Sequence, residues 1–339
     1  MKKKGILILV IIAVLIPTGV IFAGNLLNRP LDPPLELDVP IIAEVSKVAE
    51  APSSQSNKDE RTCGNTGKMN ILQIGVASPV EAGHPGADLI RLVVVDFDQV
   101  TAEILALPAD LWVNTPEDLV DDLDHFAPLN LIYLTAFETA PGNNEKVRIR
   151  KATQTLAQTI VDEFEFVPDK YININGDAFI VLVDTLKVDN QKGISITLET
   201  EVDGTPEFYD VYSAGPQVLD GQNTLDFVRI LYPKGIGLDY FGRFERQNLV
   251  IRALLDAVLL PENWGAVPDL LKEARKMVVT DLSVDQARDL ACMVEEVDGD
   301  ANLVELTLNE EVFFNGQGRM VSDEEAIKEL IALLQGDTE

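Results

Sequence analysis

The chain has 339 residues and is strongly acidic, with 56 Asp plus Glu against 27 Lys plus Arg and a net charge of -29. Nucleic-acid binding needs a basic footprint, so this balance excludes a general nucleic-acid-binding surface and argues against adhesion to an anionic membrane or wall. Cys63 and Cys292 lack the spacing of a redox or zinc motif and are compatible with one disulfide in an oxidising compartment. His84 and His125 are far apart, so we expect no histidine-based metal site.

The N-terminal 23 residues predict a basic cytoplasmic stub and a transmembrane signal anchor. Three lysines at 2–4 precede an uncharged, apolar run at 5–23, which is long enough to cross a bilayer core. Basic residues before a span favour a cytoplasmic N-terminus, so we expect a single-pass protein of the cell membrane with an extracytoplasmic C-terminal domain. A cleaved signal peptide is the alternative, because Ala23 and Gly24 are small, although Ile21 occupies a position where cleavage needs a small residue.

Residues 24–68 predict an extracytoplasmic linker. Proline and serine recur in this segment and a periodic apolar pattern is lacking. Residues 69–339 are then enough for one large domain with a well-buried core.

Strands and helices alternate along this domain. Residues 70–76 and 89–96 are apolar runs typical of central strands, and a third strand at 101–107 follows so closely that it should form a hairpin with the second. Residues 176–186 favour a helix, although their Ile-Val-Leu-Val centre would also suit a strand. The alternation predicts a single α/β/α domain with a central mixed sheet flanked by helices. Further helices are expected at 152–164, 223–231, 242–260, 283–294 and 323–334, and further strands at 171–175, 194–201 and 303–308.

A cationic cluster between residues 219 and 247 stands out against the acidic background. Arg243, Arg246 and Gln247 are spaced i, i+3 and i+4, which puts them on one helical face. Guanidinium groups bind phosphate oxygens in a fork geometry, so this face predicts a site for a phosphorylated ligand. The alternative is a helix face whose arginines only form salt bridges with the surrounding carboxylates.

The same region carries a family resemblance. Gly-Pro-Gln-Val-Leu-Asp-Gly-Gln-Asn-Thr-Leu-Asp-Phe-Val-Arg at 215–229 and Arg-Phe-Glu-Arg-Gln at 243–247 resemble the signature of the LytR-CpsA-Psr family, also called the cell-envelope-related transcriptional attenuator family. No basic helix-turn-helix pattern accompanies it, so we expect no nucleic-acid partner. Further segments at 70–75, 87–96, 107–113, 129–133 and 179–184 resemble other motifs of the family, in the family order.

The resemblance implies a phosphotransferase that moves a glycopolymer from a polyprenyl pyrophosphate carrier to peptidoglycan or another wall acceptor. The charge of a pyrophosphate must be neutralised by arginines and a divalent cation, here Mg²⁺, and its polyprenyl tail needs an apolar groove. The resemblance assigns Asp88 as a metal ligand and Asp239 as a catalytic acidic partner that orients Arg243 or serves as base. A strand-edge turn for Asp88 and a helix cap for Asp239 are the alternatives. The residues expected to bind pyrophosphate are Arg229, Arg243, Arg246 and Gln247, with Arg243 also catalytic.

Four family positions are substituted in this chain. A metal-binding Asp corresponds to Ala77, two arginines correspond to Ala109 and Leu231, and an acidic residue corresponds to Tyr240. Losing one group that stabilises transition-state charge commonly costs about 2.7–4 kcal/mol in the barrier. A catalytically degenerate relative, acting as a lipid-phosphate-binding or scaffold module of the envelope, is therefore the second interpretation.

Two basic residues could compensate for the lost arginines. Arg91 lies three positions after Asp88, but alternation along a strand would put the two on opposite faces unless a bulge intervenes. Lys234, in the loop between the two arginine motifs, is the better candidate.

Overall fold

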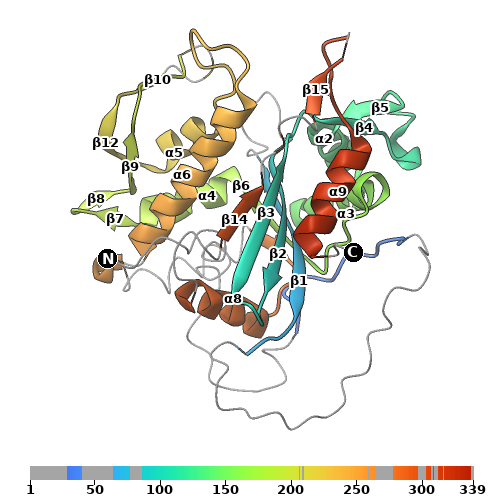
Figure 1. Cartoon of the computed structure of the whole chain (residues 1–339), viewed down its shortest axis with the longest axis horizontal. Helices are drawn as coiled ribbons and strands as arrows, with labels where there is room; N and C mark the ends of the chain where they lie inside the picture. Colours follow the sequence, from blue (N-terminus) through green and yellow to red (C-terminus); the bar gives the residue numbers. More distant parts are fainter. Residues whose placement is uncertain are drawn as a thin grey trace.

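A six-stranded mixed sheet forms the centre of the computed structural model (Figure 1). β1 (Lys68–Val76) pairs antiparallel with β2 (Ala87–Asp96), and β2 pairs antiparallel with β3 (Thr101–Leu107). β6 (Lys170–Asn175) runs parallel to β1, and β14 (Leu303–Leu306) runs parallel to β3, while β13 (Val278–Thr280) is antiparallel to β6. The strand order is β13-β6-β1-β2-β3-β14. The residues that the structure describes are 29–39, 64–76, 86–205, 207, 210–258, 260–263, 278–296, 303–306, 308, 312–315 and 317–336.

Helices cover both faces of this sheet, as Figure 1 shows. Alternate residues of β1 separate the two cores: Leu72 and Ile74 pack with α2, α3 and α9, whereas Met69 and Ile71 pack with α4, α5, α6 and α8. The predicted α/β/α architecture with a central mixed sheet is therefore confirmed. The helices are α2 (Leu129–Thr139), α3 (Glu145–Phe164), α9 (Glu324–Gln335), α4 (Gly176–Thr185), α5 (Gly221–Arg229), α6 (Tyr240–Val258) and α8 (Val284–Glu296).

Short two-stranded ribbons and single turns decorate this framework. The ribbons pair β4 (Trp112–Asn114) with β5 (Phe126–Pro128), β7 (Lys187–Val188) with β8 (Gln191–Lys192), β9 (Ile194–Leu198) with β12 (Gly215–Leu219), β10 (Val202–Asp203) with β11 (Val211–Tyr212), and β15 (Val312–Phe314) with β16 (Met320–Ser322). Two 3₁₀ turns span Glu117–Leu119 and Pro261–Asn263.

Local chemistry explains where the predicted elements begin and end. The predicted hairpin of the second and third strands is confirmed, and its turn holds Val100 at a φ of 55°. The ambiguous stretch at 176–186 is a helix, because the Asn175 side chain accepts a hydrogen bond from the Ala178 amide at 2.8 Å and caps its first turn. The predicted helix at 152–164 begins earlier, at Glu145, where Asn144 provides the cap.

Part of the expected linker lies along the domain. Leu31 donates its amide hydrogen to Leu282 O at 3.1 Å, and Leu35 and Leu37 pack against the core under α3. The anchor expected at 5–23 and Cys63 lie outside the described residues, whereas Cys292 is disulfide-bonded. Within the described part of the chain, none of the helices combines the length and the apolar character that a bilayer crossing needs.

Candidate functional site

A β-bulge at the start of β2 turns Asp88 toward α5 and α6. The register pairs Gly75 with Leu89 and Val76 with Ala87, so Asp88 is the extra residue of the bulge. Its carboxylate accepts a hydrogen bond from Arg229 Nε of α5 at 3.1 Å. One bulged residue therefore brings a strand end and α5 together at the predicted site.

Arg243 of α6 also binds Asp88. Its Nη2 atom lies 3.3 Å from Asp88 Oδ1 and donates to the backbone carbonyl of the same residue at 3.0 Å. The predicted metal ligand and two of the predicted phosphate-binding arginines thus form one cluster in the structure. Two arginine side chains therefore share the single carboxylate of Asp88.

Arg91 lies on the same side of the sheet as Asp88, which is the outcome expected if a bulge intervenes between them. The bulge is the reason, because it shifts the alternation by one residue between the two positions. Arg91 is only 1 % exposed, and its Nη2 atom donates to Asn248 Oδ1 of α6 at 2.7 Å. Its contact with α6 ties the middle of β2 to the helix that carries the arginine motif.

Asp239 directly precedes α6 and orients Arg246, not Arg243 as the resemblance suggested. Asp239 Oδ1 accepts from the Gly242 amide at 3.0 Å, the geometry of an N-cap, while Oδ2 accepts from Arg246 Nη1 at 3.0 Å. Arg246 also donates to the Ile230 carbonyl. Burial lowers the pKa of Arg246, and the charge of Asp239 opposes that shift. Asp239 is therefore a helix cap and an ion-pair partner at once.

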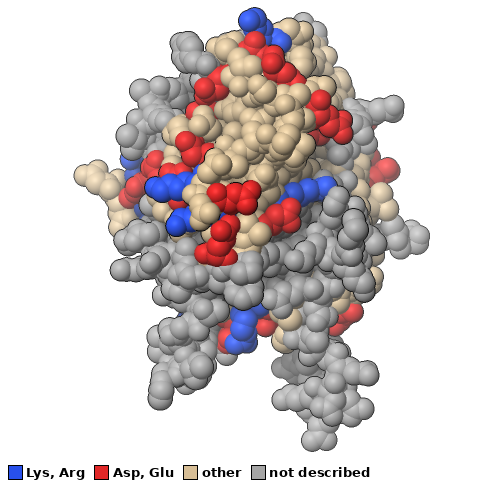
Figure 2. Space-filling model, turned by 90° about the vertical axis from the view of Figure 1, so that its left-hand side faces the viewer, with Lys and Arg blue, Asp and Glu red and all other residues tan. Residues whose placement is uncertain are grey.

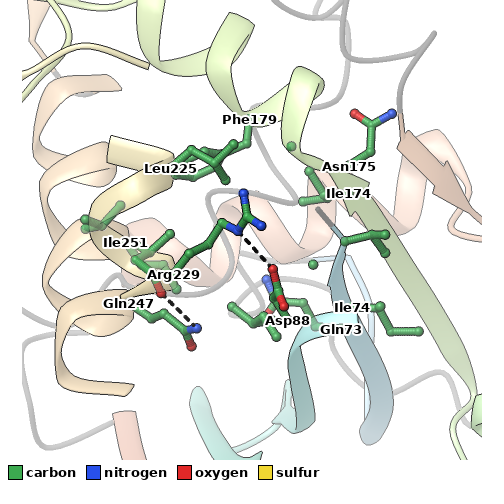
Figure 3. Close-up of a pocket in the computed structure, with 16 residues that line it drawn as sticks. Gln73, Ile74, Asp88, Ile174, Asn175, Phe179, Leu225, Arg229, Gln247 and Ile251 are labelled. Atoms are coloured by element: carbon green, nitrogen blue, oxygen red, sulfur yellow. Dashed lines mark hydrogen bonds and ion pairs between the residues drawn. The ribbon is translucent and has the colours of Figure 1, made fainter. Parts of the chain in front are cut away.

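Asp88, Arg229 and Gln247 line a pocket between the sheet and α4, α5 and α6 (Figure 3). In this view Arg229 and Asp88 point toward one another in the middle of the pocket. Gln247 donates to the Val228 carbonyl at 3.5 Å, and its Oε1 atom is buried without a hydrogen-bond partner. The walls are mostly apolar and include Ile74, Val76, Leu89, Ile174, Phe179, Leu225, Val228, Val250 and Ile251. The pocket thus joins a charged corner to an apolar interior.

The predicted binding residues differ in how far they reach solvent. The Arg229 side chain is 19 % exposed, whereas those of Arg243 and Arg246 are 6 % and 7 % exposed. On the face seen in Figure 2, acidic and basic side chains are interspersed among uncharged ones. Arg229 is therefore the most accessible of the three arginines.

The substituted family positions have taken up structural contacts. Tyr240 donates its hydroxyl hydrogen to Asp110 Oδ2 at 3.0 Å, and Asn130 Nδ2 donates to Asp110 Oδ1 at 2.9 Å. Burial, followed by the charge of Asp110, raises the pKa of Tyr240, so its hydroxyl stays a neutral donor. Ala109 is 3 % exposed, and Leu231 packs against the core.

Lys234 is not among the residues that line the pocket. Lys234 pairs with Asp203 at 3.3 Å and its side chain is 67 % exposed, so the better of the two expected substitutes is tied to another carboxylate. Ala77 lies outside the described residues.

The side chains of the pocket could hold Mg²⁺ only together with a bound phosphorylated substrate. Among the described residues, no group of three or more His, Cys, Asp or Glu side chains is arranged to hold a metal ion. Asp88 offers the pocket one carboxylate, and Mg²⁺ characteristically binds through one or two carboxylates together with waters and substrate phosphates. The residues present therefore fit Mg²⁺ if phosphate oxygens supply the other ligands.

Sequence reasoning missed Gln73, which lines the pocket from β1. Gln73 is 4 % exposed, and its Oε1 atom is buried without a hydrogen-bond partner. A single amide in the middle of the apolar run Asn-Ile-Leu-Gln-Ile-Gly was the signal that could have identified it.

The sequence of this chain is similar to those of a known protein family and of several curated proteins. A model of the LytR_cpsA_psr family matches residues 40–335. The chain belongs to this family. Its curated relatives include the polyisoprenyl-teichoic acid–peptidoglycan teichoic acid transferase TagV of Bacillus subtilis, 22 % identical over 218 residues, which are 64 % of this chain and 50 % of the relative. Biofilm regulatory protein A of Streptococcus mutans is 27 % identical over 251 residues, which are 72 % of this chain and 56 % of the relative. The match thus spans about half the length of each of these relatives.

Solved structures of the LytR_cpsA_psr fold superpose on this chain. The crystal structure of Bacillus subtilis TagV gives a TM-score of 0.58 at 18 % identity, covering 81 % of this chain and 100 % of that chain. TagT bound to LI-WTA gives a TM-score of 0.57 at 18 % identity, covering 80 % of this chain and 90 % of that chain. At this level of identity the likeness establishes the fold alone.

Proposed function

We propose that this LytR_cpsA_psr protein binds a glycopolymer linked to polyprenyl pyrophosphate and transfers it to peptidoglycan or another cell-wall acceptor. The observation that carries the proposal is the pocket in which Asp88, Arg229 and Gln247 border a largely apolar interior. Two curated relatives are teichoic acid transferases that act between a polyisoprenyl carrier and peptidoglycan, by their names. A pocket with one charged corner and apolar walls suits a ligand with an anionic head and a hydrocarbon tail.

The arginines would bind the pyrophosphate. Arg229 is the accessible one, and Arg243 would add a second cation at the same corner, with Gln247 beside them. A phosphate oxygen that approaches Arg229 would compete with Asp88 for the guanidinium, which forms charge-assisted, forked bonds to phosphates as well as to carboxylates. The first isoprene units would contact Phe179, Leu225 and Ile251 on the walls.

The transfer step is a displacement at phosphorus. The acceptor hydroxyl oxygen attacks the phosphorus atom that bears the polymer, the bridging P–O bond breaks, and polyprenyl phosphate leaves with the electron pair. Arg229 and Arg243 would stabilise the charge that develops on the phosphoryl oxygens. The hydroxyl proton would pass to a carboxylate, for which Asp239 is the candidate beside Arg246. Mg²⁺ held by Asp88 and the phosphates would supply further charge neutralisation.

We also propose that the run at 5–23 anchors the protein in the cell membrane with the domain outside. The support is in the sequence: an uncharged apolar run of this length behind three lysines has the features of a signal anchor. An anchor would keep the domain next to lipid-linked substrates.

A second candidate function is a binding module without transferase activity. It is favoured by Ala109 and Leu231, which carry no charge where the family has arginines, and by Tyr240, which engages Asp110. Binding and transfer must therefore be measured separately.

The test is titration of the full-length protein, in detergent, with a short-chain polyprenyl pyrophosphate, with and without Mg²⁺. Arg229→Ala removes a charge-assisted bond worth about 1.5–3 kcal/mol, so we expect affinity to fall about 10- to 100-fold. Lys234→Ala, which removes an exposed lysine paired with Asp203, is the matched control and should bind like the wild type. Equal affinities of the wild type and Arg229→Ala would refute the assigned pocket. A transfer assay with lipid-linked polymer and peptidoglycan then separates the transferase from the binding module.

A further inference from the structure

Residues 29–39 form an ordered segment, here called the strap, that completes the edge of the sheet. Pro30 bridges Ser283, and the amide hydrogens of Leu31 and Asp32 bond to Leu282 O at 3.1 Å and Thr280 O at 2.9 Å. The Thr280 amide in turn donates to Asp32 Oδ2 at 3.2 Å. The strap therefore pairs with β13, which would otherwise be an edge strand.

The strap then runs along α3, where two glutamines hold its backbone. The Glu36 amide donates to Gln154 Oε1 at 2.8 Å, and the Gln154 side-chain amide donates back to Glu36 O. Gln158 repeats this arrangement with Asp38, at 2.8 Å and 2.9 Å. Two extended residues span about 6.6 Å and four helical residues about 6 Å, so glutamines at i and i+4 match every second residue of an extended chain.

Apolar contacts and proline complete the attachment. Leu35 and Leu37 alternate with the clamped residues Glu36 and Asp38 and pack against the core under α3, so the alternation of the strap is that of a strand with one buried side. Tyr171 donates its hydroxyl hydrogen to Pro33 O at 3.3 Å, and Arg150 donates to Pro34 O at 3.2 Å. Consecutive prolines reduce the conformational entropy that is lost when the segment is ordered.

We propose that the strap is a fixed part of the folded domain, so that residues 24–28 alone separate the proposed anchor at 5–23 from the domain in sequence. The proposal rests on the anchor proposed above. Residues 24–28 reach about 20 Å when fully extended, whereas a linker of residues 24–68 would reach about 150 Å. The domain is then held next to the bilayer and cannot move freely above it.

The point of attachment also sets the orientation of the domain. β13 runs antiparallel to β6 and leaves Ser283 beyond the Thr280–Ile172 pair, toward the Lys68 end of the sheet. Asp88 lies at the other end, where β1 finishes at Val76. The strap therefore turns the Lys68 end toward the bilayer and the arginine site away from it, toward the wall acceptor.

Energy transfer to a lipid dye in vesicles tests this orientation on the full-length protein. One sample carries a donor fluorophore at Ile236, in the exposed loop before α6, and the other at Leu333, near the end of α9 that lies beside Lys68. Both side chains are exposed, at 69 % and 55 %. We expect stronger transfer from position 333 than from position 236.

Releasing the strap should abolish this difference. Gln154→Ala/Gln158→Ala removes the clamp from α3, and Glu36→Pro/Asp38→Pro removes the two strap amide donors and leaves the residues of α3 unchanged. Gln222→Ala, which removes a glutamine that bonds Asp226 on α5, is the control and should behave like the wild type. Hydrogen exchange should show the amides of residues 36 and 38 protected in the wild type and unprotected in the Gln154→Ala/Gln158→Ala variant.

The possible outcomes separate the two proposals. Equal transfer from both positions in the wild type, or stronger transfer from 236, would overturn the orientation, and unprotected amides at 36 and 38 would overturn the strap. Protein that does not sediment with the vesicles would refute the anchor, while the hydrogen-exchange result still decides whether the strap is fixed. Binding of polyprenyl pyrophosphate should be the same in the strap variants and the wild type, because the strap does not touch the pocket.

Discussion

Asp88 organises the candidate site, because one carboxylate receives arginines from two different helices. Arg229 reaches it from α5 and Arg243 from α6, at 3.1 Å and 3.3 Å. These contacts are the salt bridges that the alternative interpretation expects, in which the arginines only neutralise carboxylates. The two arginines nevertheless share this one carboxylate, and the cluster borders an apolar pocket. A simple surface ion pair would have neither property.

Asp88→Asn separates a metal-binding role of this residue from an arginine-holding role. The amide keeps the shape of the side chain but loses the negative charge that a cation requires. We therefore expect the variant to bind polyprenyl pyrophosphate without Mg²⁺ at least as tightly as the wild type, because Arg229 and Arg243 are no longer neutralised. Added Mg²⁺ should no longer strengthen binding. Calorimetric titrations with and without Mg²⁺ measure both effects, and an unchanged Mg²⁺ response would show that Asp88 does not bind the metal.

At the scale of elements, one residue before α6 contributes both to the stability of the helix and to the geometry of the candidate site. Asp239 caps the helix through Gly242, and a Cβ atom at position 242 would lie 2.0 Å from Asp239 Oδ2, so glycine leaves room for the cap. The same carboxylate holds Arg246. A change at Asp239 therefore affects both the helix and the arginine face.

Two substitutions at Asp239 separate these effects. Asp239→Ala loses the cap and should lower the free energy of unfolding by about 0.5–2 kcal/mol, whereas Asp239→Asn keeps a capping oxygen and should change it little. Both variants lose the charge that orients Arg246, so we expect both to bind polyprenyl pyrophosphate more weakly than the wild type. Thermal unfolding and ligand titration test the two expectations. Wild-type affinity in both variants would leave Asp239 with the capping role alone.

The sequence predicted the central elements well, because their signals are local. The strands at 70–76, 89–96 and 101–107 are apolar runs between turn residues, and the helices at 223–231 and 242–260 were displaced by only two residues from α5 and α6. The grouping of Asp88, Arg229, Arg243 and Gln247 was also expected from the resemblance, and the structure brings them together.

What the sequence could not predict depends on contacts between distant residues. The bulge at Asp88 follows from pairing between β1 and β2, and no local pattern marks it. Residues 29–39 were expected to be linker because proline and charged residues hide a strand-like alternation, and their partners Gln154 and Gln158 lie more than a hundred positions away. Asp239 was expected to orient Arg243 but contacts Arg246. Which of the two arginines it contacts depends on the direction of its carboxylate before α6, and the sequence does not specify that direction.

At the scale of the whole molecule, the excess of carboxylates makes stability sensitive to pH. A net charge of -29 opposes compaction through self-repulsion. Buried carboxyl groups make the stability depend on pH as well. Asp281, which lies beside the strap and β13, is only 1 % exposed, and desolvation raises its pKa to about 6. Burial also raises the pKa of Glu163 and of Asp289.

We expect the free energy of unfolding to fall as the pH rises from about 4 to about 6.5, with Asp281 responsible for a distinct share. A carboxyl group whose pKa is higher in the folded than in the unfolded state stabilises the fold below its unfolded pKa of 3.8, and this contribution is lost as the pH rises through about 6. A rise of the Asp281 pKa from 3.8 to about 6 corresponds to a contribution of at most about 3 kcal/mol to the free energy of unfolding. Asp281→Asn keeps an oxygen that can accept from the Tyr171 amide, as Asp281 Oδ1 does at 2.9 Å, but it does not titrate. Urea unfolding at a series of pH values should therefore give a shallower slope for Asp281→Asn than for the wild type. The slope should not vanish, because Glu163 and Asp289 titrate in the same direction, and identical slopes for the two proteins would contradict the assignment to Asp281.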